Sequence, residues 1–238
     1  MINVFPALAG FGAGFALLAA VPVGAAEAAR AADTKSEVPA EAVKAEAVAV
    51  ERSEDATRVA NWIASSGDNR SLPYVIVDKK AARAYLFSAK GKALSDAPVL
   101  IGVALGDDAT PGIGSKSLSE IGPAERTTPA GRFLAKFGIA AGNNKVLWVD
   151  YATSVALHTI PVGNKEKRRE RMLSKTIEDN RITFGCINVP KVFYNKGVVP
   201  LFQKKGGYVY VTPDIKPLEE VFPRLRVQPF LDAAAAAN

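Results

Sequence analysis

Short apolar runs separated by turn-forming residues constrain the fold of this 238-residue chain more than any other feature. The runs are rich in Val, Ile, Leu, Tyr and Phe, which is typical of strands. Charged residues and glycine stand between them, as in Lys90-Gly91-Lys92. The predicted strands lie at residues 74–77, 83–87, 98–104, 132–137, 146–150, 154–158 and 207–212. This pattern predicts a mainly β fold, a β-sandwich or barrel-like body with a few short helices.

Helices are predicted around these strands. From about residue 58 the apolar residues fall on one face of a short helix that ends near Gly67. Pro190 is well placed to open another short helix over residues 191–196, because the first turn of a helix leaves its amide groups unpaired in any case. Residues 213–232 are expected to wrap around the domain.

The N-terminal part differs in composition from the predicted domain. Residues 1–26 carry no charged side chain and end in small residues, which predicts a cleaved signal peptide. An uncleaved membrane anchor or another apolar segment are the alternatives, since the basic residues that usually open a signal peptide are missing. Residues 27–57 predict an Ala/Glu/Lys-rich linker, residues 58–232 the folded domain and residues 233–238 a frayed tail. We therefore expect an exported protein of the periplasm or cell envelope.

The chain holds one cysteine, Cys186, and one histidine, His158. A lone cysteine is usually a small buried apolar residue, and a lone histidine is usually a packing or surface residue. The surroundings favour another interpretation. A strand-like run and a glycine precede Cys186 and Pro190 follows it, which indicates a tight turn that presents the thiol. A cysteine nucleophile needs a base, and His158 is the only imidazole that could act as one.

The run Thr183-Phe184-Gly185-Cys186-Ile187-Asn188 resembles the motif of the L,D-transpeptidase catalytic-domain family (YkuD-like), which reads Ser/Thr-x-Gly-Cys-aliphatic-Asn/Arg after an upstream histidine. His158 matches that histidine. The resemblance covers about residues 73–212 and includes the Thr-Pro-x-Gly segment at residues 128–131. Phe184 stands where the family often has a histidine. The interval between His158 and the motif is also longer than usual, which implies an insertion.

The resemblance implies a peptidoglycan L,D-transpeptidase that works in cell wall biogenesis and cell shape. Cys186 would attack the third residue of a tetrapeptide stem, release D-alanine and pass the acyl group to an amine of another stem peptide, with His158 as the base. An imidazolium beside Cys186 would lower the pKa of the thiol. Gly185 would let the substrate approach backbone amides that stabilise the oxyanion. Thr183 and Asn188 are candidates for orienting the site or the substrate, and each could equally form a local turn hydrogen bond.

Three alternatives stay open at this point. Water could resolve the same acyl-enzyme, which would make the protein an L,D-carboxypeptidase or a hydrolase that releases proteins from the wall. A non-catalytic wall-binding domain is the second alternative, because Phe184 departs from the motif. A redox thiol is the third, although the chain has no second cysteine to resolve an oxidised Cys186.

Charge and composition bear on the partners. The formal charge of +6 suits an anionic polymer or surface. The implied insertion, residues 164–175, holds six basic and two acidic residues, and predicts either a solvated helix or an anionic contact through Lys165–Lys175. We expect no nucleic-acid partner, because no reading motif accompanies the charges. One cysteine and one histidine argue against a structural zinc site, and we expect no cofactor and a monomer.

A long polar loop is predicted at residues 106–127. Loops of this length in a compact domain are often lids. Asp107 and Asp108 are expected to be solvated acids of a turn rather than a cation site.

Overall fold

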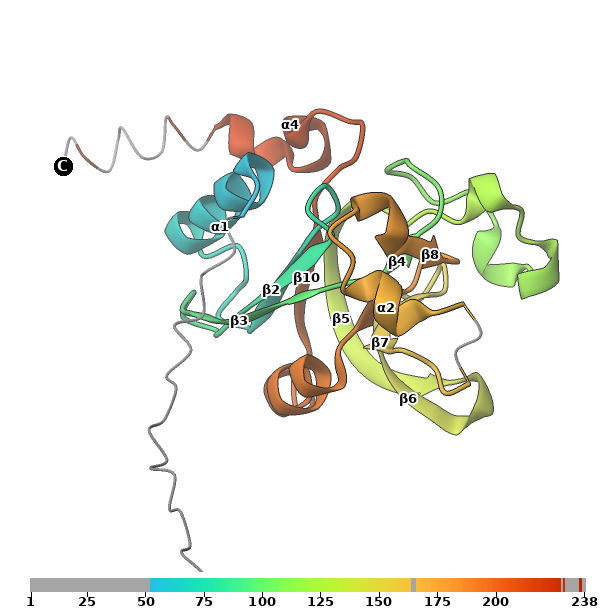
Figure 1. The fold of residues 1–238 in the computed structure, drawn as a ribbon. Coiled ribbons are helices and arrows are strands. Elements are labelled where there is room, and N and C mark those ends of the chain that lie inside the picture. The colour runs from blue at the N-terminus through green and yellow to red at the C-terminus, as the bar shows by residue number, and fades with distance from the viewer. Residues whose placement is uncertain (1–51, 164–165, 228, 230–235, 237–238) are drawn as a thin grey trace, which may run out of the picture. The chain divides into compact units, whose positions relative to one another are not determined.

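The computed structural model describes residues 52–163 and 166–227, with the isolated residues 229 and 236. Its body is an eight-stranded sheet in the order β3-β2-β1-β10-β5-β6-β7-β9, accompanied by a two-stranded ladder of β4 and β8 (Figure 1). The predicted mainly β fold with short helices is therefore confirmed. The predicted segment 1–26, most of the linker and most of the tail lie outside the described residues. In the part of the chain that is described, no helix is both long and apolar enough to span a bilayer.

The strands are β1 (Tyr74–Asp78), β2 (Arg83–Phe87), β3 (Ala93–Pro98), β4 (Ile101–Gly102), β5 (Gly131–Ala140), β6 (Asn144–Asp150), β7 (Val155–Thr159), β8 (Arg181–Thr183), β9 (Ile187–Val189) and β10 (Gly207–Val211). The α-helices are α1 (Glu54–Ser66), α2 (Arg168–Met172), α3 (Val199–Phe202) and α4 (Leu218–Val221).

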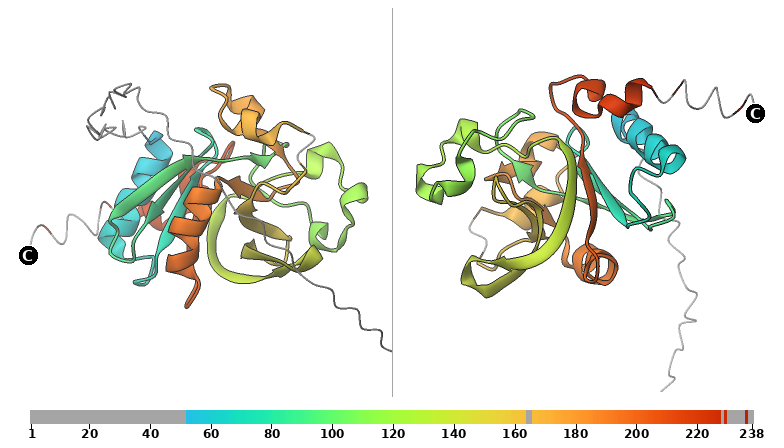
Figure 2. Two further views of the ribbon diagram at one scale, coloured as in Figure 1. Left: turned by 60° about the horizontal axis from the view of Figure 1, so that its bottom comes forward. Right: turned by 180° about the vertical axis from the view of Figure 1, so that it is seen from behind.

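Strand β5 joins the two halves of the large sheet. Its first half pairs with β10, from Gly131 opposite Val211 onward, and its second half pairs with β6, where Lys136 lies opposite Trp148. The strand bends strongly between these two pairings (Figure 2). The sheet therefore curls, and the side chains on its inner face form one core while the half around β1 carries a second core on its outer face.

Every residue of β1 is buried, because both faces of this strand are covered. Val75 and Val77 point into the inner core, whereas Tyr74 and Ile76 point outward to α1 and α4. The predicted apolar face of the first helix is confirmed, although the helix begins at Glu54, with Ser53 accepting a hydrogen bond from the Ala56 amide as its N-cap.

Of the strand predicted at residues 98–104 only β4 is formed, and the strand that pairs with β2 is β3, which the sequence did not predict. The turn at residues 88–92 returns the chain directly beside β2. Because β3 is a sheet edge, most of its side chains are exposed, and its sequence lacks an apolar run. The apolar run after β3 has other partners. Leu100 exchanges backbone hydrogen bonds with Asn188, and β4 pairs with β8.

Two predicted helices have other bounds. The helix opened by Pro190 continues past residue 196 as a π-helical stretch, Phe193–Val198, and then as α3. The helix predicted within residues 164–175 is limited to α2, which is anchored by the buried side chain of Met172.

Candidate active site

The only histidine and the only cysteine lie on and directly before two adjacent parallel strands. His158 is near the end of β7, and Cys186 directly precedes β9. In the pairing of β7 with β9, Leu157 lies opposite Ile187 and His158 lies opposite Asn188. Leu157 and Ile187 are fully buried in the inner core. Since successive side chains alternate between faces, His158 and Asn188 share the opposite face, toward which Cys186 also projects.

Cys186 and His158 line one cavity of about 550 Å³. The rest of its wall comes from β6, the start of β7, the segment after β7 and the helix after Pro190. These residues include Asn144, Lys145, Val146, Trp148, Ser154, Ile160 and Tyr194. Both residues thus face the same cavity, and its volume is in the range of a small-ligand pocket.

The turn that carries Cys186 is held by hydroxyl groups. Thr183 Oγ1 donates to the Cys186 carbonyl oxygen at 2.6 Å and accepts from the Gly185 amide at 3.1 Å. Thr128 Oγ1 donates to the Gly185 carbonyl oxygen at 2.8 Å. Thr183 therefore acts as a local turn residue, which is one of the two roles that its sequence position left open. The Gly185 amide is already bonded inside the protein, so the Cys186 amide is the better candidate for an oxyanion donor.

The backbone conformation of Gly185 and its close contact with Thr127 require a glycine at this position. Its φ is +124°, a conformation that residues with a side chain rarely adopt. A Cβ at this position would also lie 2.7 Å from the Thr127 carbonyl oxygen. The absence of a side chain at Gly185 thus lets the turn that carries Cys186 pack against Thr127, just before the Thr-Pro-x-Gly segment.

The hydrogen bonds of His158 define its tautomer. Its Nδ1 lies 2.8 Å from the carbonyl oxygen of Thr159, which can only accept, so Nδ1 carries the proton. Its Nε2 lies 3.3 Å from the side-chain Nδ2 of Asn188. An amide NH₂ can only donate, so Nε2 is the unprotonated nitrogen, as a general base needs. The group that orients the imidazole is a backbone carbonyl.

Both reactive groups are shifted toward their neutral forms. Burial lowers the pKa of His158, and the charge of Arg168 adds to this against the opposing effect of the Thr159 carbonyl. Burial likewise raises the pKa of the half-buried Cys186 thiol, and the Ala156 amide and Arg168 only partly oppose it. The thiol donates to the Ser154 carbonyl oxygen at 3.7 Å. The surroundings of Cys186 and His158 thus favour the thiol and the neutral imidazole.

Phe184 is covered by the loop at residues 106–127. The guanidinium carbon of Arg126 lies 3.9 Å from the centre of the Phe184 ring, a cation–π contact. The loop also reaches the turn between β6 and β7, where Ser154 Oγ donates to the Gly114 carbonyl oxygen at 3.3 Å. The loop thus contacts Phe184, close before Cys186, and the turn whose Ser154 carbonyl oxygen accepts the hydrogen bond of the thiol.

A buried ion cluster is hydrogen-bonded to the Thr-Pro-x-Gly segment at residues 128–131. Lys79 is fully buried, and its Nζ donates to Asp107 at 2.8 Å and to the Thr128 carbonyl oxygen at 3.0 Å. Asp107 further accepts the backbone amides of residues 214–216. The expectation that Asp107 is solvated is therefore wrong, because three amides and an ammonium surround it, whereas Asp108 is exposed as expected.

Sequence reasoning missed several residues of this site. Trp148 forms part of the cavity wall. Gly138 leaves room for its indole ring, since a Cβ there would lie 2.7 Å from the ring. Arg168 donates to Asn188 Oδ1 at 2.9 Å from the basic segment that was expected to face solvent or a partner. The signal for Trp148 was the period of two along β6, which places it on the same face as Val146. The sequence carries no signal for Arg168, whose role depends on a contact 20 residues away.

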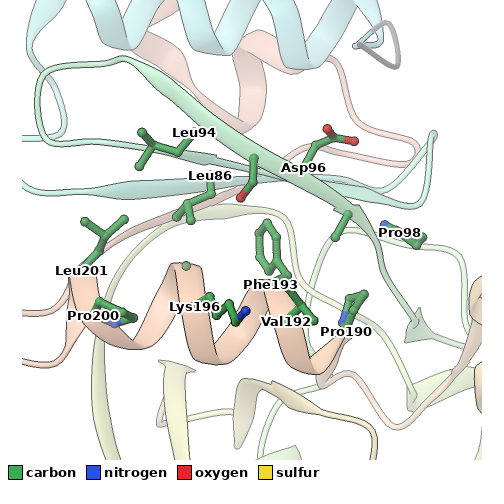
Figure 3. Close-up of a pocket in the computed structure, with 13 residues that line it drawn as sticks. Leu86, Leu94, Asp96, Pro98, Pro190, Val192, Phe193, Lys196, Pro200 and Leu201 are labelled. Carbon is green, nitrogen blue, oxygen red and sulfur yellow. The ribbon is translucent and has the colours of Figure 1, made fainter. Parts of the chain in front are cut away.

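Another hollow of about 540 Å³ lies between β3 and the helix after Pro190 (Figure 3). Leu86, Phe193 and Leu201 line it, and its one carboxylate, Asp96, is paired with Arg83. It contains neither the cysteine nor the histidine, so it offers nothing for acyl transfer. Among the described residues no three His, Cys, Asp or Glu side chains gather as they would around a metal ion.

No family model matches the sequence, and no curated protein matches it. Solved structures are similar to it at low identity. An L,D-transpeptidase from Xylanimonas cellulosilytica is 14% identical, with a TM-score of 0.36, over 59% of this chain and 60% of that chain. The catalytic domain of the L,D-transpeptidase from E. faecium is 18% identical, with a TM-score of 0.34, over 58% of this chain and 95% of that chain.

The helical cell shape determining protein Pgp2 (K307A mutant) from Campylobacter jejuni is 14% identical, with a TM-score of 0.40, over 76% of this chain and 64% of that chain. The chain spans between about half and 60% of the length of three of the solved structures that are similar to it. The L,D-transpeptidases among them belong to the family that the motif of this chain resembles.

Proposed function

We propose that this protein is a cysteine acyltransferase of the cell envelope, an L,D-transpeptidase that acts on peptidoglycan stem peptides. The observation that carries the proposal is the single cavity that holds both Cys186 and a His158 whose Nδ1 is bound to a backbone carbonyl. A thiol with an oriented, unprotonated imidazole beside it is the arrangement that acyl transfer needs.

The neutral resting pair suggests how the reaction begins. His158 Nε2 takes the proton of Cys186 as the sulfur attacks the substrate carbonyl, so the thiolate forms only when substrate is bound. The Cys186 amide is our candidate for the oxyanion donor, a contribution worth about 3–4 kcal/mol where it has been measured. The imidazolium then gives its proton to the departing amine of D-alanine.

The second half-reaction consumes the acyl-enzyme. An amine from another stem peptide enters the cavity, His158 removes its proton, and the new amide leaves Cys186 as the free thiol. Water in place of the amine would give the hydrolase alternative. We place transpeptidation first because the motif around Cys186 resembles that of the L,D-transpeptidase family.

Export follows from this function, since the substrate lies outside the cytoplasm. Residues 1–26 are the candidate for the export signal or anchor. An anionic contact through Lys165–Lys175 is the further partner that we propose for the basic segment, although Arg168 and Arg171 of this segment already bind groups within the protein.

The test is intact-mass spectrometry after incubation with a carbapenem and, separately, with a tetrapeptide stem. The expected result is a covalent adduct on the wild type and none on C186A. A tetrapeptide with an acceptor amine should yield the cross-linked product, whereas release of the tripeptide alone would favour the hydrolase. Peptidoglycan binding without any adduct would instead indicate a non-catalytic wall-binding domain.

A further inference from the structure

Arg168 of α2 touches the site through a chain of directional hydrogen bonds. Its Nη1 donates to Asn188 Oδ1 at 2.9 Å, and Asn188 Nδ2 lies 3.3 Å from His158 Nε2. The other edge of the guanidinium is held by Glu166, whose Oε2 accepts from Nε at 2.8 Å and lies 2.7 Å from Nη2. The Arg168 side chain is only 14% exposed, so it is a fixed part of the protein.

Each member of this chain determines the orientation of the next. A guanidinium can only donate, so the Asn188 amide must turn its oxygen toward Arg168. The NH₂ group then faces His158, and because it too can only donate, it favours an Nε2 without a proton. An imidazolium would place an N–H against this NH₂ group, so the arrangement opposes protonation of His158. The positive charge of Arg168 acts in the same direction.

We propose that Arg168 is a positioning residue for His158: by fixing the Asn188 amide it keeps Nε2 unprotonated. The inference rests on the proposed function for its catalytic meaning, but the hydrogen-bond chain can be tested without any turnover. After the proton is taken, the same arrangement destabilises the imidazolium and so favours its delivery to the departing amine.

Other groups could also act on the charge of His158. Those that share its cavity, or that reach it through Asn188, come from four different elements. They are Lys145 of β6, Arg168 of α2 with its partner Glu166, Cys186 before β9 and Tyr194 of the helix after Pro190. Only Arg168 among them is connected to the imidazole by hydrogen bonds that set its tautomer.

The single histidine makes the test direct, because every imidazole signal in a ¹H–¹⁵N spectrum belongs to His158. We would compare R168M with R169M, which removes the same charge from the next, exposed position of the same helix. The expected result is that R168M raises the titration midpoint of His158, whereas R169M leaves it near wild type. R168K keeps the charge and one donor, so its midpoint should lie between those of R168M and the wild type.

The rate of carbapenem acylation gives the catalytic readout. At acidic pH, where the raised titration midpoint leaves more of His158 protonated, R168M should slow acylation about ten-fold, which corresponds to a shift of about one pH unit. If Arg168 acts through Asn188, R168M combined with N188A should be no slower than N188A alone. Fully additive losses, equal effects of R168M and R169M, or an unchanged His158 spectrum in R168M would overturn the proposal. A wild type that is never acylated would contradict the proposed function, while the spectra would still decide the role of Arg168.

Discussion

His158 Nδ1 lies 2.8 Å from the carbonyl oxygen of Thr159, the next residue along β7. The imidazole is oriented by the backbone carbonyl at the end of this strand, so it needs no carboxylate for this purpose. It leaves Nε2 as the only nitrogen that can accept a proton. The tautomer of His158 thus depends on the backbone carbonyl at the end of β7.

The first prediction concerns this base. H158Q should slow carbapenem acylation of Cys186 by about 10²–10⁴, the usual contribution of a positioned general base. The rate is measured from the mass shift of the intact protein over time. Because His158 is half-buried, the thermal unfolding midpoint of the variant must be checked alongside. An unchanged rate in a folded H158Q protein would show that His158 is not the base.

The second prediction concerns pH. Because the pKa of His158 is lowered, the imidazole loses its proton at a pH below the ordinary value of about 6.5. The acylation rate should therefore rise with pH to a plateau, and the midpoint of this rise should lie below about pH 6.5. Since the pKa of Cys186 is raised, thiolate absorbance, measured as wild type minus C186A, should appear only above the ordinary range of a cysteine, about 8.5. Thiolate absorbance already present in the acid range would instead indicate a preformed thiolate–imidazolium pair.

The third prediction concerns the nucleophile turn. G185A forces a side chain into a positive-φ position and a Cβ to within 2.7 Å of the Thr127 carbonyl oxygen. Strain of this kind costs roughly 1–3 kcal/mol, and relief by shifting the turn would displace Cys186. We therefore expect lower stability in urea and loss of acylation.

A matched control exists for this variant. Gly112 also has a positive φ, +75°, but a Cβ there would meet nothing within 4 Å. G112A should thus carry the backbone cost alone, about 1 kcal/mol, and keep its acylation rate. Equal acylation by G185A and G112A would contradict the role given to Thr127.

The sequence predicted the β framework because alternation and turn residues are local signals. The motif that resembles the L,D-transpeptidase family singled out Cys186 and His158, and both line the same cavity. It did not predict β3, where an edge strand carries exposed residues such as Leu94 and so lacks the apolar run of a strand. Arg168 and Lys79 were out of reach for another reason. Their partners are distant in sequence, and only the folded chain shows which charges turn inward.

The last prediction concerns the buried cluster under the Thr-Pro-x-Gly segment. Burial alone would raise the pKa of Asp107, but the Lys216, Asp214 and Ile215 amides and the Lys79 ammonium outweigh it and lower this pKa to about 2. A group with a lowered pKa stabilises the fold above its unfolded value of about 3.9, and this stabilisation is lost as the pH falls toward 2. D107N removes the charge and leaves the fully buried Lys79 with one carboxylate partner fewer.

We expect D107N to lose about 3–5 kcal/mol of unfolding free energy near neutral pH, the usual cost of breaking a buried ion pair. The measurement is urea unfolding at several pH values, and the gap to wild type should narrow below about pH 4 as Asp107 protonates. D108N is the control, because the exposed Asp108 contacts only the Lys216 ammonium and its loss should cost less than about 1 kcal/mol. Since Lys79 also holds the Thr128 carbonyl, D107N should slow acylation as well. A D107N protein as stable as D108N would mean that the cluster does not support the segment behind the nucleophile.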